Sequence, residues 1–291
     1  MTKHHHILSI GIVGGGFVGR ATYGFKNSKT DVIIYDLQKD LCIPNDSTMS
    51  DIYKCDIVFV AVPTPMSEDG SCYTKIVEDV VSDLKANHIK NIFVRSTVPV
   101  GTCKRLGVHF MPEFLTEKNW AQDFYNCPLW IIGADSQTVI FRNTIQKILD
   151  DAREENMILS SKIMWVTTME AELIKYTRNC FLATKVGFFN EIYSLCEKKG
   201  IDFDLVREGV TADPRIGPSH SRVPNKEFFN GRTALKKGFG GTCLCKEIQS
   251  MRKQYELMKV PAIIMDAVWH RNITIDRPER DWENDKGRAV I

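Results

Sequence analysis

The fold of this 291-residue chain is decided by the stretch Ile7-Leu8-Ser9-Ile10-Gly11-Ile12-Val13-Gly14-Gly15-Gly16-Phe17-Val18-Gly19. A short apolar run, typical of a β-strand, leads into the pattern Gly14-x-Gly16-x-x-Gly19, and a helical stretch follows it. A second apolar run over residues 31–36 ends in the carboxylate of Asp36, about 20 residues after the glycines. Strand, glycine loop, helix and acid in this order predict a dinucleotide-binding unit, with a plain glycine turn as the alternative.

Each part of this unit has a physical role. Gly14 makes a tight turn, Gly16 lets a pyrophosphate come close, and Gly19 lets the helix pack against the strand. The free N–H groups at the start of the helix would bind phosphate. The carboxylate of Asp36 would hold the adenosine ribose hydroxyls and repel a 2′-phosphate, so the unit is predicted to bind NAD rather than NADP.

Strands and helices continue to alternate after this unit. Residues 56–62 form a continuous apolar run, typical of a strand buried on both faces. Residues 91–95 and 130–133 are predicted strands as well, and residues 75–87 are a predicted amphipathic helix. The alternation predicts an α/β fold, a doubly wound parallel sheet of the Rossmann type, over residues 1–168.

Ligands of such sheets bind beyond the carboxyl ends of the strands. The loop Pro63-Thr64-Pro65, Thr97 and the region of Glu113 each follow a predicted strand, so they are expected to line one rim. Glu113 and Glu117 lie four residues apart and share a face if their segment is helical. A solvated acidic face is the simpler interpretation, whereas the position at the rim favours a general base.

From residue 169 onward the pattern becomes helical. Residues 171–199 form one long helix-like stretch with few breakers, and Gly200 is a fitting C-cap for it. Such a helix carries more apolar surface than one small domain covers, so a homodimer built on it is predicted. Lys175 and Asn179 lie four residues apart on one face of this helix, either as solvated polar groups or as site residues.

The remaining segments complete an all-helical domain over residues 169–291, predicted to bind substrate and to dimerise. Further predicted helices cover residues 202–210, 246–255 and 262–275. Residues 214–237 carry prolines, glycines and scattered positive charge, and they are predicted to be a basic loop, either solvated or closing over a phosphate. The last residues, 277–291, are predicted to be a polar tail.

A cysteine follows three closely spaced glycines in Lys237-Gly238-Phe239-Gly240-Gly241-Thr242-Cys243 and precedes a predicted helix. A thiol at a loop-to-helix junction lies near the positive end of the helix dipole, which favours the thiolate. Cys243 is therefore either a nucleophile or a small buried residue beside a glycine turn. The second interpretation is the better one for an isolated cysteine, but the other motifs of this chain favour the nucleophile.

Composition argues against several other classes of protein. The net charge of +2 gives no strong field that points to nucleic acid or to a membrane surface, and neither a bilayer-spanning run nor a signal peptide is recognised. The nine irregularly spaced cysteines argue against a secreted disulfide framework, so reduced thiols and a cytoplasmic location are predicted. No metal site is predicted, because Cys243-x-Cys245 lacks a second pair. His4-His5-His6 is assigned no function.

Taken together, the motifs resemble the UDP-glucose/GDP-mannose dehydrogenase family, and within it the members that act on UDP-glucose. The matching stretches are the glycine loop of residues 14–19, Ala61-Val62-Pro63-Thr64-Pro65, Ser96-Thr97-Val98-Pro99-Val100-Gly101, Pro112-Glu113-Phe114-Leu115-x-Glu117, Ala171-Glu172-Leu173-Ile174-Lys175-Tyr176-Thr177-Arg178-Asn179, Asp213-Pro214-Arg215-Ile216-Gly217 and Gly238-Phe239-Gly240-Gly241-Thr242-Cys243. They occur in the family's order and cover nearly the whole chain. Several independent motifs are far more specific than any one of them.

The resemblance implies an NAD-dependent oxidoreductase that oxidises the C6 alcohol of UDP-glucose in two steps to UDP-glucuronate, a precursor for polysaccharide synthesis. Cys243 would attack the intermediate aldehyde to give a thiohemiacetal, which is oxidised to a thioester. Glu113 would be the base for hydrolysis, and Thr97 would position a water near it. Lys175 and Asn179 would stabilise the oxyanions.

The full set of predicted site residues follows from the motifs and the resemblance. The catalytic residues are Cys243, Lys175, Asn179, Glu113, Thr97 and Glu247. The cofactor-binding residues are Gly14, Gly16, Phe17, Val18, Gly19, Asp36, Pro63, Thr64, Thr97 and Lys246. The substrate-binding residues are Glu113, Phe114, Leu115, Glu117, Lys175, Asn179, Arg215, Phe239 and Gly240. By the resemblance, Arg215 would reach the substrate of a neighbouring subunit.

The chain departs from the family pattern at two places. The family has aspartate four residues after the cysteine, where this chain has Glu247, which keeps the carboxylate but reaches one methylene further. Longer members carry a third, C-terminal domain over the nucleotide, and this chain is expected to be a short form without it. The basic segment of residues 218–237 is then expected to supply phosphate contacts, through Arg222, Lys226 or Lys236.

Three alternatives to this function stay open. The first is the same chemistry on GDP-mannose or a UDP-N-acetylhexosamine. The second is a β-hydroxyacid dehydrogenase, which transfers one hydride and has no need of a cysteine. The third is an inactive binding or scaffolding protein. The yield of NADH per substrate molecule separates a two-step enzyme, a one-step enzyme and an inactive protein.

Overall fold

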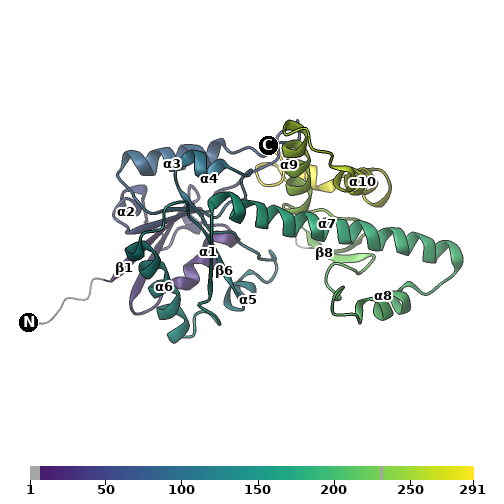
Figure 1. Cartoon of the computed structure of the whole chain (residues 1–291), viewed down its shortest axis with the longest axis horizontal. Helices are drawn as coiled ribbons and strands as arrows, with labels where there is room; N and C mark the ends of the chain where they lie inside the picture. The colour runs from purple at the N-terminus through teal and green to yellow at the C-terminus, as the bar shows by residue number, and fades with distance from the viewer. Residues whose placement is uncertain (1–6, 230–231) are drawn as a thin grey trace, which may run out of the picture. The chain divides into compact units, whose positions relative to one another are not determined.

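The computed structural model describes residues 7–229 and 232–291, so the three histidines at positions 4–6 lie outside the described residues (Figure 1). The chain divides into two compact units. The first consists of the residues up to Thr64 together with Thr74–Lys175, and the second consists of Pro65–Tyr73 together with Tyr176–Ile291. The domain boundary between residues 168 and 169 stays a prediction.

The first unit is built on a seven-stranded sheet with the strand order β2-β1-β3-β4-β5-β6-β7. The strands are β1 (Leu8–Val13), β2 (Thr30–Tyr35), β3 (Ile57–Val60), β4 (Ile92–Val94), β5 (His109–Phe110), β6 (Trp130–Gly133) and β7 (Ile163–Val166). All neighbours are parallel except β5 and β6, so the predicted doubly wound, mostly parallel sheet is confirmed. Because β1 lies between β2 and β3, the strand order reverses at β1, and ligands bind at such a reversal.

Helices cover both faces of this sheet. They are α1 (Phe17–Thr22), α2 (Met49–Ile52), α3 (Lys75–Ala86), α4 (Thr102–Leu106), α5 (Trp120–Tyr125) and α6 (Val139–Glu154), with short turns η1 (Tyr23–Phe25) and η2 (Lys39–Leu41). Figure 1 shows α3 and α4 on one face and α5 and α6 on the other. Strand β3 explains this layering, because alternate side chains of a strand point to opposite faces. Phe59 joins the hydrophobic cluster under α5 and α6, whereas Val58 and Val60 join the cluster under α2 and α3.

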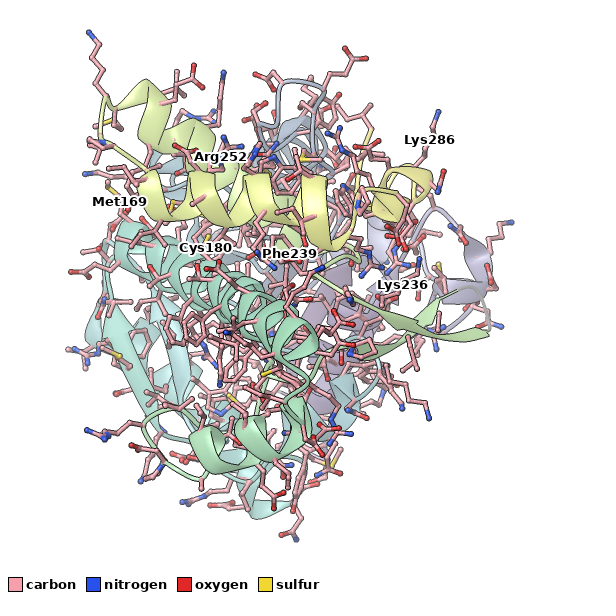
Figure 2. The ribbon with its side chains drawn as sticks, turned by 90° about the vertical axis from the view of Figure 1, so that its right-hand side faces the viewer. Met169, Cys180, Lys236, Phe239, Arg252 and Lys286 are labelled. Atoms are coloured by element: carbon pink, nitrogen blue, oxygen red, sulfur yellow. The ribbon has the colours of Figure 1, made fainter. Side chains whose placement is uncertain are left out.

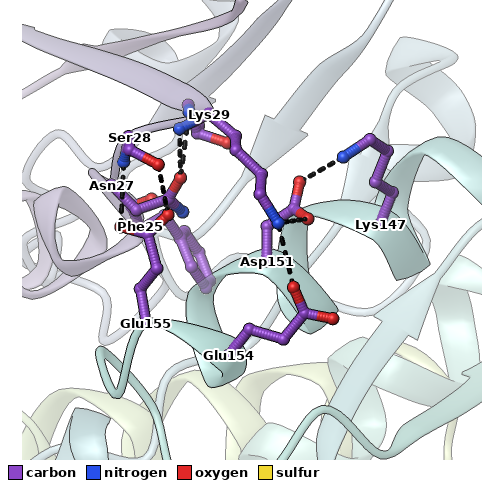
Figure 3. Close-up of polar contacts among 9 residues, drawn as sticks. Phe25, Asn27, Ser28, Lys29, Lys147, Asp151, Glu154 and Glu155 are labelled. Atoms are coloured by element: carbon purple, nitrogen blue, oxygen red, sulfur yellow. Dashed lines mark hydrogen bonds and ion pairs between the residues drawn. The ribbon is translucent and has the colours of Figure 1, made fainter.

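A polar network joins the turn before β2 to the last turns of α6 (Figure 3). Lys29 Nζ lies 3.0 Å from Asp151 Oδ1 and 2.9 Å from Glu154 Oε2, and Lys147 pairs with the other oxygen of Asp151. The Ser28 N–H donates to Glu155 Oε2 at 3.0 Å. Since β2 is the edge strand, these contacts fix the start of the strand that ends at Asp36.

The second unit is mainly helical. The long helix α7 (Thr168–Lys199) begins in the first unit and continues in the second, and the predicted helical region with a long helix is confirmed. The other helical elements are α8 (Phe203–Thr211), α9 (Leu244–Leu257), α10 (Ile263–Arg271), η3 (Asn272–Asp276) and η4 (Asp281–Asn284). Figure 2 shows α7 and α9 side by side, and the hydroxyls of Tyr176 and Ser250 meet between them at 2.9 Å.

Two segments of the second unit differ from their predictions. The domain is not all-helical, because the predicted basic loop contains an antiparallel hairpin of β8 (Asn225–Phe229) and β9 (Arg232–Lys236). The last residues, predicted to be a polar tail, also contain buried apolar side chains, namely Trp282 and Ala289. The Met66 N–H donates to the carbonyl of Ala289 at 2.9 Å, and the Ile291 N–H donates to the carbonyl of Met66 at 3.1 Å. Backbone pairing with residues 65–73 therefore orders this segment.

None of the helices within residues 7–229 and 232–291 is both long enough and apolar enough to cross a bilayer.

Candidate active site

The glycine loop of the first unit joins β1 to α1 at the carboxyl end of β1. Gly14 has φ +107°, and a Cβ there would lie 2.5 Å from the carbonyl oxygen of Ala61. A Cβ on Gly19 would lie 1.9 Å from the carbonyl oxygen of Gly14. A Cβ on Gly16 would meet nothing within 4 Å. The protein's own backbone therefore requires glycine at positions 14 and 19, whereas Gly16 borders open space into which a pyrophosphate fits.

The acid at the end of β2 is fastened to this loop. Asp36 Oδ2 accepts a hydrogen bond from the Gly15 N–H at 2.7 Å, and Oδ1 accepts one from the Gln38 N–H at 2.9 Å. The carboxylate is half-buried and is hydrogen-bonded to the residue that precedes Gly16. The residues present fit an adenosine ribose and pyrophosphate. Phe17 and Val18, also predicted to bind cofactor, form the first turn of α1.

The next two loops follow β3 and β4, which are parallel neighbours, so they lie at the same edge of the sheet. Thr64 and Thr97 are buried in them, and Pro63 is exposed. Ser96 Oγ donates to the carbonyl of Val62 at 2.6 Å and so ties the two loops together.

A buried ion pair follows β5 at this edge. Lys175 Nζ lies 2.6 Å from Glu113 Oε1, and the two residues are 2% and 5% exposed. Glu113 Oε2 accepts a hydrogen bond from the Leu115 N–H at 2.8 Å, and the ammonium lies 5.9 Å from the ring centre of Phe114. Burial alone would raise the pKa of Glu113, but the Lys175 charge and hydrogen bond outweigh it and the pKa is lowered. Glu113 is thus held as a carboxylate.

The segment around Glu113 is not helical, so Glu113 and Glu117 do not share a helix face. Glu113 is buried, whereas Glu117 is exposed. The interpretation as a solvated acidic face is therefore wrong for Glu113. The reason is that Lys175, from a helix far along the chain, supplies a counter-ion that a local pattern does not reveal.

Sequence reasoning missed Glu172, which is buried one helical turn before Lys175 on α7. Its Oε2 accepts a hydrogen bond from the Gly101 N–H at 2.5 Å, and its Oε1 accepts one from the Cys103 N–H at 2.8 Å. Glu172 therefore caps the first turn of α4 and holds the loop that carries Thr97. The sequence feature that could have indicated this role is the position of Glu172 in the same motif as Lys175.

The cysteine loop of the second unit leads into α9. Cys243 is half-buried and is the N-cap residue of α9, so it lies at the loop-to-helix junction, as the sequence predicted. Its Sγ lies 3.6 Å from Thr242 Oγ1. Gly238 and Gly241 have φ of +64° and +71°, which explains why glycine occupies both turns of the loop.

Three side chains that sequence reasoning missed hold this loop in place. Asn190 Oδ1 on α7 accepts from the Gly238 N–H at 3.0 Å. Asn272 makes two hydrogen bonds to Phe239, with Oδ1 accepting from its N–H at 2.8 Å and Nδ2 donating to its carbonyl at 2.9 Å. The Arg277 guanidinium packs where a Cβ on Gly240 would lie, and it pairs with both oxygens of the Asp281 carboxylate at 2.7 and 2.9 Å.

The other predicted residues of the second unit are distributed as follows. Glu247 is buried in the first turn of α9, and its N–H donates to the carbonyl of Cys243 at 3.0 Å. Lys246 and Asn179 are half-buried. Phe239 is buried in the loop, and Figure 2 labels it. Arg215 is exposed, with Nη2 lying 2.5 Å from Asp213 Oδ2.

The predicted phosphate contacts of the basic segment have different environments. Arg222 and Lys226 are exposed. Lys236 Nζ lies 2.7 Å from Glu279 Oε1 and 3.4 Å from Asp281 Oδ2, so acidic side chains partly neutralise it. Among the described residues, no group of three or more His, Cys, Asp or Glu is arranged to hold a metal ion.

Comparison with known proteins identifies the family to which this chain belongs. Residues 38–152 match the NAD binding domain of the UDP-glucose/GDP-mannose dehydrogenase family, and residues 169–274 match the central domain of the same family. The match to the NAD binding domain begins after the glycine loop and Asp36, so their role in binding cofactor stays a prediction.

Individual relatives agree with the family match. The chain is 31% identical to the UDP-glucose 6-dehydrogenase of Rickettsia typhi over 239 residues, which are 77% of this chain and 50% of the relative. It is 31% identical to UDP-glucose 6-dehydrogenase TuaD of Bacillus subtilis over 81% of this chain and 50% of the relative. The chain thus spans about half the length of the curated relatives it matches.

Solved structures give the same picture. A UDP-glucose dehydrogenase from the archaeon Pyrobaculum islandicum superimposes with a TM-score of 0.75 at 25% identity, covering 94% of this chain and 69% of that one. A 3-hydroxyisobutyrate dehydrogenase from Mycobacterium tuberculosis has a TM-score of 0.67 at 14% identity, a likeness of fold alone. The chain belongs to the UDP-glucose/GDP-mannose dehydrogenase family, a family of NAD-dependent nucleotide-sugar dehydrogenases.

Proposed function

We propose that this chain oxidises the C6 alcohol of UDP-glucose to the carboxylate of UDP-glucuronate, with NAD as hydride acceptor and Cys243 as nucleophile. Relatives named UDP-glucose 6-dehydrogenase support this choice of substrate. The observation that carries the proposal is the placement of Cys243. Cys243 is half-buried and occupies the N-cap position of α9, after a loop whose shape Asn190, Asn272 and Arg277 maintain.

The overall reaction consumes one water and transfers two hydrides to two NAD molecules, with release of three protons. In the first oxidation the alcohol loses its hydroxyl proton to a base and becomes an aldehyde. Cys243 Sγ then adds to the aldehyde carbon and forms a thiohemiacetal, because a second hydride leaves only from a tetrahedral carbon that carries an oxyanion. The thiohemiacetal loses the second of the two hydrides and becomes a thioester. Water then adds to the thioester carbon, the C–S bond breaks, and the thiolate is restored.

Side chains of both units would supply the acid–base and oxyanion-stabilising chemistry. Glu113 is ionised in its pair with Lys175, so it can accept a proton from the water that attacks the thioester. Thr97 would position that water. Lys175 Nζ and the Asn179 amide would donate to the oxyanions of the thiohemiacetal and of the hydrolytic intermediate. Glu247 would assist proton transfer in the first oxidation.

The experiment that tests this proposal is the yield of NADH per molecule of UDP-glucose. The unaltered chain is expected to give two NADH. Cys243→Ser is expected to lower the rate of complete oxidation by about a thousandfold or more, because a serine hydroxyl is a far weaker nucleophile at neutral pH. Cys245→Ser is the matched control, since this buried thiol lies 3.5 Å from the carbonyl of Phe239 and its replacement keeps a donor.

Each other yield would change the conclusion. One NADH per sugar with no effect of Cys243→Ser would indicate single-hydride chemistry. Turnover with GDP-mannose or a UDP-N-acetylhexosamine, but not with UDP-glucose, would keep the mechanism and change the substrate. No turnover with any nucleotide sugar, from a chain that still binds one, would indicate a binding protein.

The proposed enzyme is a homodimer that uses α7. Phe181, Phe188 and Leu195 recur every seven residues on this helix and are 65%, 56% and 56% exposed. Side chains at this spacing form one apolar stripe, and a second copy of the helix would cover it. Light scattering should give twice the mass of the chain, and Phe188→Glu should give the monomer. A monomer for the unaltered chain would contradict the dimer.

The basic hairpin segment is proposed to bind the diphosphate of the substrate. Arg222→Ala and Lys226→Ala should each raise the KM for UDP-glucose several-fold and leave the KM for NAD unchanged, because an exposed charge contributes up to about 1 kcal/mol. Lys198→Ala, which removes an exposed charge elsewhere on the second unit, is the control. An unchanged KM for UDP-glucose in both variants would contradict this role.

A further inference from the structure

The first unit contains a buried arginine that the proposed mechanism does not use. Arg95 directly follows β4 and is 2% exposed. Its Nη1 lies 3.3 Å from Met111 Sδ, a weak acceptor, and its buried Nε makes no hydrogen bond to any described residue. No carboxylate of the described residues lies within 4.0 Å of its guanidinium. A buried cation without a counter-ion is costly, so its position calls for a functional explanation.

Arg95 directly follows β4, and Glu113 lies three residues after β5, the parallel neighbour of β4, so both groups lie at the same end of adjacent strands. The guanidinium contacts Met111, two residues before Glu113, and the charge of the Glu113 carboxylate acts on it. Among the described residues, the Cys127 thiol also faces Arg95, and the Lys175 ammonium also faces Glu113. Both oxygens of Glu113 already accept hydrogen bonds, one from Lys175 and one from the Leu115 N–H. Because the guanidinium makes no hydrogen bond to Glu113 among the described residues, Arg95 acts on Glu113 through charge, across an interior in which screening by water is weak.

The proposed function makes conflicting demands on Lys175. The same ammonium that pairs with Glu113 would have to donate to a substrate oxyanion, and while it does so the buried carboxylate loses its counter-ion. A buried carboxylate without one takes up a proton and cannot act as a base. The guanidinium of Arg95 has no such second task.

We propose that Arg95 is a positioning residue that keeps Glu113 ionised while Lys175 is engaged with the oxyanion. The proposal rests on the function proposed above. Burial lowers the pKa of Arg95 to about 10, so the guanidinium stays charged at neutral pH. In the resting state burial raises the pKa of Glu113, while Lys175 and, more weakly, Arg95 lower it. Once Lys175 is engaged, Arg95 is the cation among the described residues that still faces this carboxylate.

The test measures protonation of Glu113 directly and does not depend on turnover. The Lys175→Met variant represents the state in which the ammonium has left. The protonated carboxyl band of Glu113 is followed by infrared difference spectroscopy against pH, with Glu113→Gln in the same background as the blank. Adding Arg95→Met to the Lys175→Met variant should raise the midpoint pH of the Glu113 titration by at least about one pH unit, which is a tenfold change in proton affinity. Adding Arg95→Lys should leave the midpoint near that of Lys175→Met alone.

The outcomes separate this inference from the proposed function. An equal midpoint with and without Arg95→Met would overturn the role of Arg95, whatever the enzyme's substrate. If Arg95→Met does not fold, Arg95→Gln removes the charge, keeps a donor near Met111 and carries the same expectation. In the otherwise unaltered chain, Arg95→Met should move the acidic limb of the profile of kcat against pH to higher pH. Arg95→Lys should leave this limb near its position in the unaltered chain. Absence of all turnover would contradict only the proposed function.

Discussion

The two glycine loops of this molecule are shaped by different kinds of neighbour. In the first loop, of residues 14–19, the space for a Cβ is filled by backbone, namely the carbonyl oxygens of Ala61 and Gly14. In the second loop, of residues 238–241, it is filled by side chains, namely Asn272 Oδ1 and the Arg277 guanidinium. The first loop is therefore imposed by chain geometry, whereas the second depends on side chains that mutation can remove.

The supports of the two loops also lie at different distances along the sequence. The Gly15 N–H reaches a carboxylate 21 residues away, within one strand–helix–strand unit. The second loop is held by Asn190, 48 residues before Gly238, and by Asn272, 33 residues after Phe239. The first loop is a local motif, and the second is the product of the tertiary fold of its unit.

The largest effect is expected from Gly19→Ala. Its Cβ would overlap the Gly14 carbonyl, and neither helix nor strand can move away without breaking the sheet contact. We expect a loss of about 3 kcal/mol or more of unfolding free energy, measured by denaturant titration. Gly16→Ala is the control, because its Cβ enters open space. It should cost no more than about 1 kcal/mol but weaken NAD binding at least tenfold. Equal stability of the two variants would contradict the packing argument.

The second largest effect is expected when a side chain that holds the second loop from far along the sequence is removed. Asn272→Ala removes the partner of the buried Phe239 N–H and leaves the Phe239 carbonyl with the weak donor Cys245 Sγ at 3.5 Å, which should cost about 2–4 kcal/mol. The rate with UDP-glucose should fall in parallel, while NAD binding by the first unit should change little. Thr274→Ala, an exposed change in the same turn, should be nearly neutral. If Asn272→Ala lowered the affinity for NAD by the same factor as the rate of turnover, the claim that the two loops are supported independently would be contradicted.

A third experiment asks whether the second loop tolerates a Cβ when its side-chain neighbour is removed. Gly240→Ala should cost about 1–3 kcal/mol, because the Arg277 guanidinium is buried and held by Asp281. In the Arg277→Ala background the same change should cost much less, which gives a coupling energy of about 1 kcal/mol or more. Gly19→Ala cannot be rescued in this way. Strict additivity of the two changes would show that the guanidinium does not limit the space at Gly240.

These differences explain what could be predicted from the sequence. The sheet, the glycine loop and Asp36 follow from local spacing and from apolar runs such as that of β3, whose side chains are buried on both faces. The position of Cys243 followed from a motif. The partners of these groups could not be predicted, because Lys175, Glu172, Asn272 and Arg277 reach their targets through tertiary packing. The hairpin of residues 225–236 was missed because its strands alternate weakly and carry many charges.

The smallest expected effect is an acid sensitivity confined to the second loop. Burial raises the pKa of the Asp281 carboxyl. The hydrogen bonds and charge of Arg277, together with the charge of Lys236, lower this pKa by more than burial raises it, so the pKa lies below its usual 3.8. A carboxyl with a lowered folded pKa contributes stability above its unfolded pKa, and this is lost as pH falls through the folded value. Hydrogen exchange at the Gly238 and Phe239 amides, corrected for intrinsic rates, should therefore show weaker protection at pH 3 than at pH 5.

Asp281→Asn should remove part of this pH dependence, because the amide keeps a hydrogen-bond acceptor for Arg277 but carries no charge to lose. The Gly14 N–H, which donates to the carbonyl of Tyr35 at 2.9 Å, is an internal reference in the first loop and should keep its protection in both proteins. An unchanged pH dependence in Asp281→Asn would mean that Arg277 holds Gly240 by packing alone. The second loop would then resemble the first, with a shape set by steric contact and not by charge.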